Sequence, residues 1–266
     1  MGFSGLVGAV FSPILTSIIS HWDWRIGTIT NAALLLIFYL PAILLPVGYI
    51  PEAHGLSPYG AASSKDGQTV HMDQIPIIPI LVVLLTIFAA IGPFCTAYPP
   101  HFPGMAENYG LPTAVGATML SVCMITNSGG KLIFGIASEK LGNFLSILIY
   151  IILSILGLLS ILFFPSSWML YIGAALTGAV YTLGSVAIVV ATRDLVGLNN
   201  YNKVYPKIYT IAIIVNAISG SAIGFMYDQF KNYRIALTIA IILLCGMIIT
   251  LIAAYRIRRR FLVVKE

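Results

Sequence analysis

The sequence predicts an all-α integral membrane protein with about eight transmembrane helices. Of its 266 residues, 59% are hydrophobic and only 9% are charged, and the mean hydropathy is +0.96. A soluble globular domain carries about 25% charged residues, so this composition excludes a soluble enzyme, a disordered chain and a nucleic-acid-binding domain. The apolar residues lie in long runs without two-residue alternation, which favours membrane-spanning helices over strands.

Eight apolar runs are long enough to cross a hydrocarbon core, which needs about 20 residues in a helix. The first run is expected to be a span and not a signal peptide. No basic region precedes it, and no clear small-x-small cleavage site separates it from the polar turn at residues 21–25. In chain order, the runs cover residues 2–20, 28–47, 75–97, 112–134, 144–164, 168–190, 208–227 and 235–255.

Lys and Arg side chains gather on one side of these spans, which predicts the orientation. Eight spans place both termini on the same side, and eleven of the 14 cations fall in the loops and span ends of that side. Because cytoplasmic loops carry the excess of cations, we expect a multi-pass protein of the cell membrane with both termini in the cytoplasm. The eleven cations are Lys65, Lys131, Lys140, Arg193, Lys203, Lys207, Arg256, Arg258, Arg259, Arg260 and Lys265.

A polar, turn-rich stretch over residues 49–74 divides the chain. We expect it to be a cytoplasmic linker between a two-helix part, residues 1–48, and a six-helix part, residues 75–255. The basic residues 256–266 then form a cytoplasmic tail that is attracted to anionic lipid. The pI of about 9.1 is therefore a consequence of topology, and we expect the lipid bilayer and no nucleic acid as a partner.

Ionisable side chains inside spans are candidates for function, because a charge in hydrocarbon is costly. The predicted spans contain essentially one, Lys131, near the end of the fourth span. It either extends its long stem to the interface or lies in a transport path or gate. The amides of Asn127 and Asn216 either join helices by hydrogen bonds or contact a solute.

Three tyrosines and a group of helix breakers extend this set of candidates. Tyr98, Tyr181 and Tyr209 either have structural or interfacial roles or offer a ring and a hydroxyl to a pore. Helix breakers in a span are tolerated beside a cavity and can mark a hinge or binding region. Those of the third span are Pro76, Pro79, Gly92 and Pro93.

No catalytic motif is present. The sequence contains no His-Glu-x-x-His, Gly-x-Ser-x-Gly or Walker loop, and its four histidines fall in predicted loops. We therefore expect that the protein is not an enzyme and that it has no cofactor and no metal site. The cysteines have no spacing typical of disulfides or zinc, and they are Cys95, Cys123 and Cys245.

The clearest motif runs from Gly130 to Gly142 and reads Gly-Lys-Leu-Ile-Phe-Gly-Ile-Ala-Ser-Glu-Lys-Leu-Gly. Glu139 and Lys140 follow Gly135 by four and five positions. This resembles the signature turn between the second and third helices of each half in the major facilitator superfamily of secondary transporters, with Glu139 where Asp is usual. The resemblance implies that Gly135 permits close helix approach and that the Glu139/Lys140 pair acts at a cytoplasmic gate. A solvated turn is the alternative.

The opening residues 2–13, with glycines followed by a proline, are similar to the fifth helix of that family. The resemblance aligns the eight spans with helices five to twelve and the linker with the central cytoplasmic loop. It implies that residues 1–48 are the last two helices of the N-terminal half and that residues 75–255 are the C-terminal half. The expected fold is thus that of the family with an N-terminal truncation of four helices.

The resemblance implies a transporter that moves a small solute by alternating access between two helical halves. A coupling ion is left open as a further partner. The alternative is a truncated, non-transporting membrane fragment, or a subunit that needs a partner chain. Residues 98–103 and 127–131 resemble the branch that includes organic-anion and monocarboxylate carriers, in which case Lys131 would pair with a carboxylate.

Overall fold

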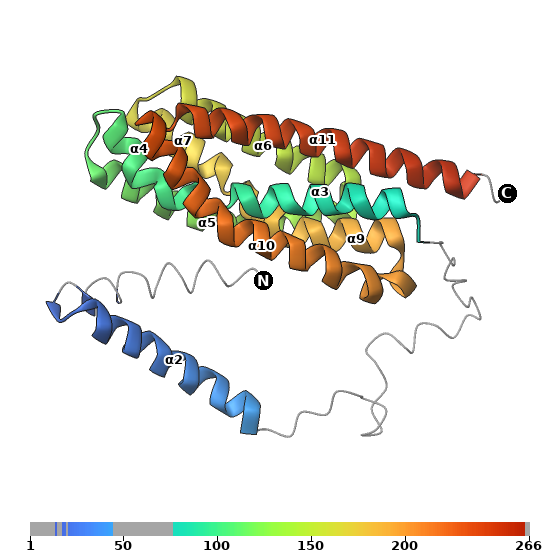
Figure 1. Ribbon diagram of the computed structural model, residues 1–266, viewed down its shortest axis with the longest axis horizontal. Helices are drawn as coiled ribbons and strands as arrows, with labels where there is room; N and C mark the ends of the chain where they lie inside the picture. The colour runs from blue at the N-terminus through green and yellow to red at the C-terminus, as the bar shows by residue number, and fades with distance from the viewer. Residues whose placement is uncertain (1–13, 15–17, 20, 45–76, 264–266) are drawn as a thin grey trace. The chain divides into compact units, whose positions relative to one another are not determined.

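The computed structural model describes residues 14, 18–19, 21–44 and 77–263, which form helices and short turns (Figure 1). The described residues contain no strand, so the all-α prediction is confirmed. The chain divides into two compact units, one of Val10–Met72 and one of Met1–Ala9 with Asp73–Glu266. Residues 77–263 of the second are called the six-helix unit below.

The first unit contains helix α2 (Trp24–Leu44), which begins four residues before the predicted apolar run of residues 28–47. At its start, Arg25 Nη1 lies 3.3 Å from Asp23 Oδ2, and the guanidinium lies 4.9 Å from the centroid of the Trp24 ring. The predicted linker and nearly all of the first predicted span lie outside the described residues. The total of about eight spans therefore stays a prediction.

In the described part of the chain, six helical segments are long and apolar enough to cross a membrane. The protein is thus a multi-pass membrane protein. The fourth segment is interrupted by a π-helical turn, and the first by a short 3₁₀ turn. In chain order the elements are α3 (Pro79–Cys95) with η3 (Pro99–His101) and α4 (Phe102–Asn108); α5 (Thr113–Leu141); α6 (Asn143–Phe163); α7 (Ser167–Thr177), α8 (Ala179–Thr182), η4 (Leu183–Ala187) and α9 (Ile188–Val196); α10 (Leu198–Phe230); and α11 (Arg234–Val263).

Most of these segments extend beyond the spans predicted from apolar runs. The seventh predicted span covered residues 208–227, whereas α10 has 33 residues and begins at Leu198. Hydropathy reports only the part of a helix that lies in hydrocarbon, while the backbone hydrogen bonds continue through the polar helix ends. For the same reason, residues 256–263 of the predicted tail continue α11 as a helix.

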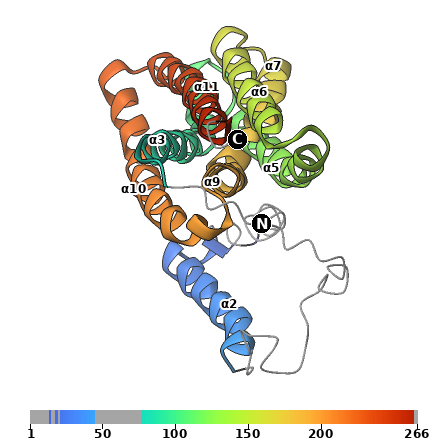
Figure 2. The same cartoon turned by 90° about the vertical axis from the view of Figure 1, so that its right-hand side faces the viewer.

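The fourth segment lies in the middle of the six-helix unit. Viewed from one end, α9 lies between α5 on one side and α3 with α10 on the other (Figure 2). Of the most apolar 18 residues of Ser167–Val196, 56% are buried, compared with 22% for α10. The fourth segment is therefore the most buried of the six, whereas much of α10 remains exposed within this unit.

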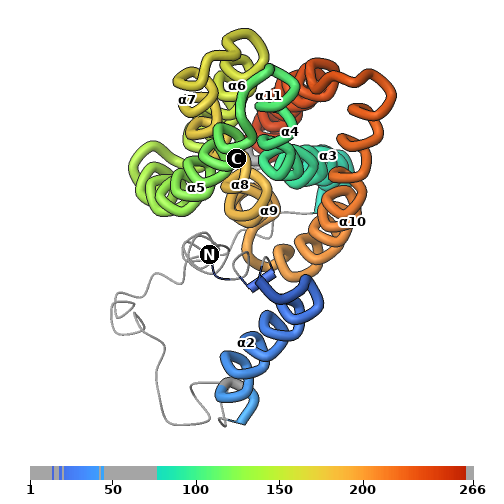
Figure 3. Tube along the Cα trace, turned by 90° about the vertical axis from the view of Figure 1, so that its left-hand side faces the viewer, coloured from blue at the N-terminus to red at the C-terminus, as the bar shows by residue number. Residues whose placement is uncertain are grey.

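The two ends of the six-helix unit are named here after glycines in the left-handed region. At the Gly142 end, Gly142 and Gly197 (φ 83° and 74°) form the turns from α5 to α6 and from α9 to α10. Figure 3 shows the Gly110 end, where α4 leads from α3 into α5. There the Tyr109 hydroxyl donates to the Ile161 carbonyl at 2.9 Å, and burial raises the pKa of this phenol.

Candidate functional site

Four side chains selected from the sequence line one cavity among the membrane-spanning helices of the six-helix unit, and they are Lys131, Tyr181, Tyr209 and Asn216. We call it the central cavity, and its volume is about 190 Å³. The walls come from α3, α5, α8, η4 and α10. Its residues are Pro93, Thr96, Lys131, Tyr181, Gly184, Ser185, Tyr209, Ala212, Ile213 and Asn216.

The last turn of α3 supplies polar backbone groups to the wall of this cavity. Pro93 lies inside α3, where its ring removes a backbone donor and disturbs the helix two residues before it ends at Cys95. The Pro93 carbonyl accepts a hydrogen bond from the Thr96 hydroxyl at 2.6 Å and one from Asn216 Nδ2 at 2.8 Å. Asn216 Nδ2 also lies 2.9 Å from the Thr96 hydroxyl oxygen. An amide of α10 thus satisfies the interrupted end of α3.

The π-helical turn η4 lies against α3 through two glycines. A Cβ added to Gly92 would be 3.1 Å from both Cα and N of Gly184. A side chain at Gly92 would be crowded by the backbone of Gly184, so the two glycines allow η4 to lie close against α3. The turn also brings Ser185 to the cavity wall, where its hydroxyl donates to the Tyr181 carbonyl at 2.6 Å. Single π-helical turns are frequent at functional sites.

Lys131 is the one charged residue among those that line the central cavity. It lies ten residues before the end of α5, about 15 Å along the helix axis. The other polar groups of the wall are hydroxyls and an amide, which donate and accept hydrogen bonds. The cavity therefore combines a cation with neutral hydrogen-bonding groups.

A row of tyrosine rings leads from the Gly142 end towards this cavity. Tyr201, Tyr205 and Tyr209 are half-buried and lie four residues apart on α10. Successive ring centroids are 4.9 and 5.3 Å apart, with planes at 15° and 17° to one another. Tyr209, the last of the row, lines the central cavity.

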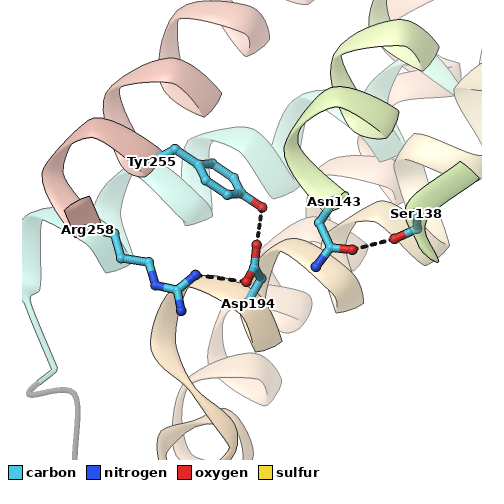
Figure 4. Close-up of polar contacts among 5 residues, drawn as sticks. All are labelled: Ser138, Asn143, Asp194, Tyr255 and Arg258. Atoms are coloured by element: carbon cyan, nitrogen blue, oxygen red, sulfur yellow. Dashed lines mark hydrogen bonds and ion pairs between the residues drawn. The ribbon is translucent and has the colours of Figure 1, made fainter. Parts of the chain in front are cut away.

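A second cavity, of about 500 Å³, opens at the Gly142 end and is called the terminal cavity. Gly135 and Glu139 of the signature turn line it, together with Asp194 of α9 and Arg258 of α11. Asp194 accepts hydrogen bonds from Arg258 Nη1 at 2.8 Å and from the Tyr255 hydroxyl at 2.6 Å (Figure 4). The side chains of Asp194 and Arg258 are only 25% and 23% exposed.

The first turn of α6 closes one wall of the terminal cavity. The Ser138 hydroxyl donates to Asn143 Oδ1 and so links the last turns of α5 to α6 (Figure 4). Asp194 and Tyr255 were not predicted from the sequence, and Arg258 was expected in the lipid-facing tail and not in this cavity. The sequence signal for Asp194 and Arg258 was only charge at helix ends, and Tyr255 gave no such signal. Charge at helix ends does not reveal that residues 61 and 64 positions apart form contacts.

The remaining selected residues lie outside the central cavity. Tyr98 is fully buried in the core, and its hydroxyl donates to the Ala236 carbonyl at 2.7 Å. Asn127 is 4% exposed on the face of α5 that contacts Gly178, and its Oδ1 has no hydrogen bond within the described part of the chain. Lys140 is exposed at the end of α5. No described atom lies within 4 Å of a Cβ added to Gly135, so the close helix approach expected there is not present between described residues.

Comparison with known proteins gives one family. The family model described as Major Facilitator Superfamily matches residues 1–205 and residues 80–264 of the chain. The two matches overlap and together cover nearly the whole sequence. Comparison with curated proteins finds no match. No group of three His, Cys, Asp or Glu that could hold a metal ion occurs within the described ranges.

Proposed function

Because the chain belongs to the Major Facilitator Superfamily, whose members are membrane transporters and not enzymes, we propose that it moves a small solute across the bilayer by alternating access. The central cavity is the proposed solute site. The observation that carries this proposal is the meeting of Lys131, Tyr181 and Asn216 in one cavity among membrane-spanning helices. Polar and ionisable groups are costly in a membrane and are retained where they line a pathway.

The proposed substrate is a small organic anion. Lys131 is the single charge on the cavity wall, and the hydroxyls of Tyr181 and Tyr209 add hydrogen-bond donors around it. A carboxylate is the group that these donors satisfy best, because a hydrogen bond from an ammonium to a carboxylate is charge-assisted. The volume of about 190 Å³ suits a small molecule.

The experiment is an uptake assay with the full chain in proteoliposomes, using small carboxylates and their neutral amide analogues. We expect uptake of carboxylates by the wild type. Lys131→Ala should reduce carboxylate uptake roughly tenfold to a hundredfold, since a hydrogen bond to a charged group contributes about 1.5–3 kcal/mol. Lys131→Arg keeps the charge and should retain part of the uptake.

The matched control is Lys203→Ala, which removes an exposed cation of α10 that does not line the central cavity. Its uptake should equal that of the wild type. Full carboxylate uptake by Lys131→Ala would refute the anion site while leaving a transporter in place. Absence of uptake of any solute by the wild type would instead support a non-transporting protein.

The terminal cavity is the proposed gate. Glu139 and the Asp194–Arg258 pair place fixed charges of both signs at the Gly142 end of α5, α9 and α11. Such contacts between helix ends stabilise one arrangement of the helices and must be exchanged for others when the helices move. The row of tyrosines on α10 would then form the wall between gate and solute site.

A further inference from the structure

A third cavity lies on the outside of the six-helix unit, in a groove between α6 and α11. Its volume is about 260 Å³, and its lining consists of Phe144, Ile252, Tyr255, Arg256 and Arg259. The Phe144 ring meets the Tyr255 ring edge-on, with centroids 5.0 Å apart. Ile252, Arg256 and Arg259 follow one another at spacings of four and three on α11 and so share one face of the helix.

The position of this groove along α11 matches the boundary between hydrocarbon and headgroups. Residues 235–254 of α11 are 20 consecutive residues without a charge, which is the length that crosses a hydrocarbon core. Arg256 and Arg259 therefore begin directly beyond the hydrocarbon, about 3 and 8 Å past residue 254. Ile252 lies just inside it. The groove thus has an apolar inner part and a cationic outer part.

The two arginines differ from their neighbour Arg258. Arg258 turns towards Asp194 in the terminal cavity (Figure 4), whereas Arg256 and Arg259 are exposed. Within the described residues neither of them takes part in an ion pair, and no acidic residue lines the groove. Two adjacent guanidinium groups at this depth favour a phosphate, which accepts two parallel hydrogen bonds from each.

We propose that the groove between α6 and α11 binds one anionic phospholipid. The phosphate lies between Arg256 and Arg259, and the start of the acyl chains lies against Phe144 and Ile252. Basic pockets between transmembrane helices are a recognised setting for anionic headgroups. The site does not depend on which solute the protein carries.

Tyr255 connects the lipid groove to the terminal cavity. The ring of Tyr255 forms part of the groove wall, and its hydroxyl donates to Asp194 Oδ2. A lipid that orders this turn of α11 thereby orders the contacts of Asp194 with Tyr255 and Arg258. The lipid site is in this way linked to the charges proposed as the gate.

The test measures lipid binding to the full chain, purified in detergent, by native mass spectrometry and by thermal stability. The probes are phosphatidylglycerol, phosphatidylcholine and inorganic phosphate. We expect phosphatidylglycerol to bind and to raise the Tm, and the other two to do neither. The double variant Arg256→Gln/Arg259→Gln should bind phosphatidylglycerol roughly thirtyfold more weakly, because each cation near an anionic headgroup contributes about a fivefold gain.

The matched control is Lys203→Gln/Lys207→Gln, which removes two exposed cations near the start of α10 without touching the groove. It should bind phosphatidylglycerol like the wild type. Arg256→Lys/Arg259→Lys keeps both charges but loses the paired hydrogen bonds, so it should bind more weakly than the wild type and more tightly than the Gln variant, which separates loss of charge from loss of folding. Equal binding of phosphatidylcholine or inorganic phosphate by the wild type overturns the proposal, as does binding by the Gln variant within twofold of the wild type.

Discussion

Asn216 illustrates how a single polar side chain connects two membrane-spanning helices. Its amide donates to the carbonyl of Pro93 and contacts the hydroxyl of Thr96, 123 and 120 residues away. The Pro93 carbonyl lies in the last turn of α3, where it lacks the backbone donor that a continuing α-helix would supply, and no water replaces that donor within hydrocarbon. The two interpretations that the sequence left open for Asn216, helix joining and solute contact, are compatible because this residue also lines the central cavity.

We predict that Asn216→Leu lowers the free energy of unfolding by about 1 kcal/mol, the usual size of an interhelical hydrogen bond in a membrane. Reversible unfolding in mixed micelles measures this change. Thr210→Val is the control, because the Thr210 hydroxyl is exposed and donates to Pro206 of its own helix. Equal effects of the two substitutions would contradict a stabilising role of the Asn216 contacts.

Asp194 and Arg258 form the most sheltered ion pair in the described part of the chain. Its side chains are 25% and 23% exposed, whereas those of Asp228 and Lys231 are 73% and 74% exposed. Removal of one partner of a sheltered pair leaves the other charge without compensation, while an exposed pair is screened by water.

A double-mutant cycle should therefore give a coupling energy of about 1–3 kcal/mol for Asp194→Asn with Arg258→Gln. The same cycle with Asp228→Asn and Lys231→Gln should give less than about 0.5 kcal/mol. Unfolding in mixed micelles provides both values. A coupling energy for Asp194 and Arg258 as small as that of the exposed pair would refute their structural contribution.

Among the elements, the interrupted fourth segment determines the shape of the central cavity. A π-helical turn takes up one more residue than an α-helical turn. If Ser167–Val196 formed a regular α-helix, the side chains after residue 183 would therefore point in different directions around the helix axis. The contact of Gly184 with Gly92 holds this turn against α3. Close packing of two backbones leaves no space for side chains.

Gly92→Leu should accordingly lower the free energy of unfolding by at least about 1 kcal/mol, because overpacking forces α3 and η4 apart. It should also reduce solute uptake, since both elements line the central cavity. Gly246→Leu is the control in α11, where no described atom lies within 4 Å of an added Cβ. We expect the control to be at least as stable as the wild type, because leucine has a higher helix propensity than glycine. Equal destabilisation by both substitutions would contradict a specific role of the contact between Gly92 and Gly184.

At the scale of the whole molecule, the charge distribution predicts the orientation. In the six-helix unit, the Gly142 end has most of the cations, including Arg193 and the arginines of α11, while the Gly110 end has Lys231 and Arg234. Cytoplasmic loops carry the excess of Lys and Arg. The Gly142 end, with the terminal cavity and the lipid groove, is therefore expected in the cytoplasm.

Cysteine labelling tests this expectation in the variant Cys245→Ser, which removes the exposed cysteine. Asn199→Cys places an exposed thiol at the Gly142 end, and Ser166→Cys places one at the Gly110 end. A membrane-impermeant maleimide should label the Ser166→Cys variant in intact cells. It should label the Asn199→Cys variant only after the cells are permeabilised. The reverse pattern would contradict the predicted orientation.

The sequence by itself determined that the protein is helical, that it lies in a membrane and approximately where its later helices run. These properties depend on the length of uninterrupted apolar runs, which is a local quantity. The signature turn at Gly135 and Glu139 was enough to indicate the family, which the match over residues 1–205 and 80–264 confirms. Lys131, Tyr181 and Asn216 were each selected because polar groups are rare in the spans.

Only the tertiary structure decided which of these residues lie together. It placed Lys131, Tyr181 and Asn216 around one cavity, buried Tyr98 in the core, and paired Asp194 with Arg258. Such contacts depend on the rotation and crossing of helices that are distant in the sequence. In a membrane, apolar surfaces contact lipid and protein equally well, so packing of small residues and interhelical hydrogen bonds fix that rotation.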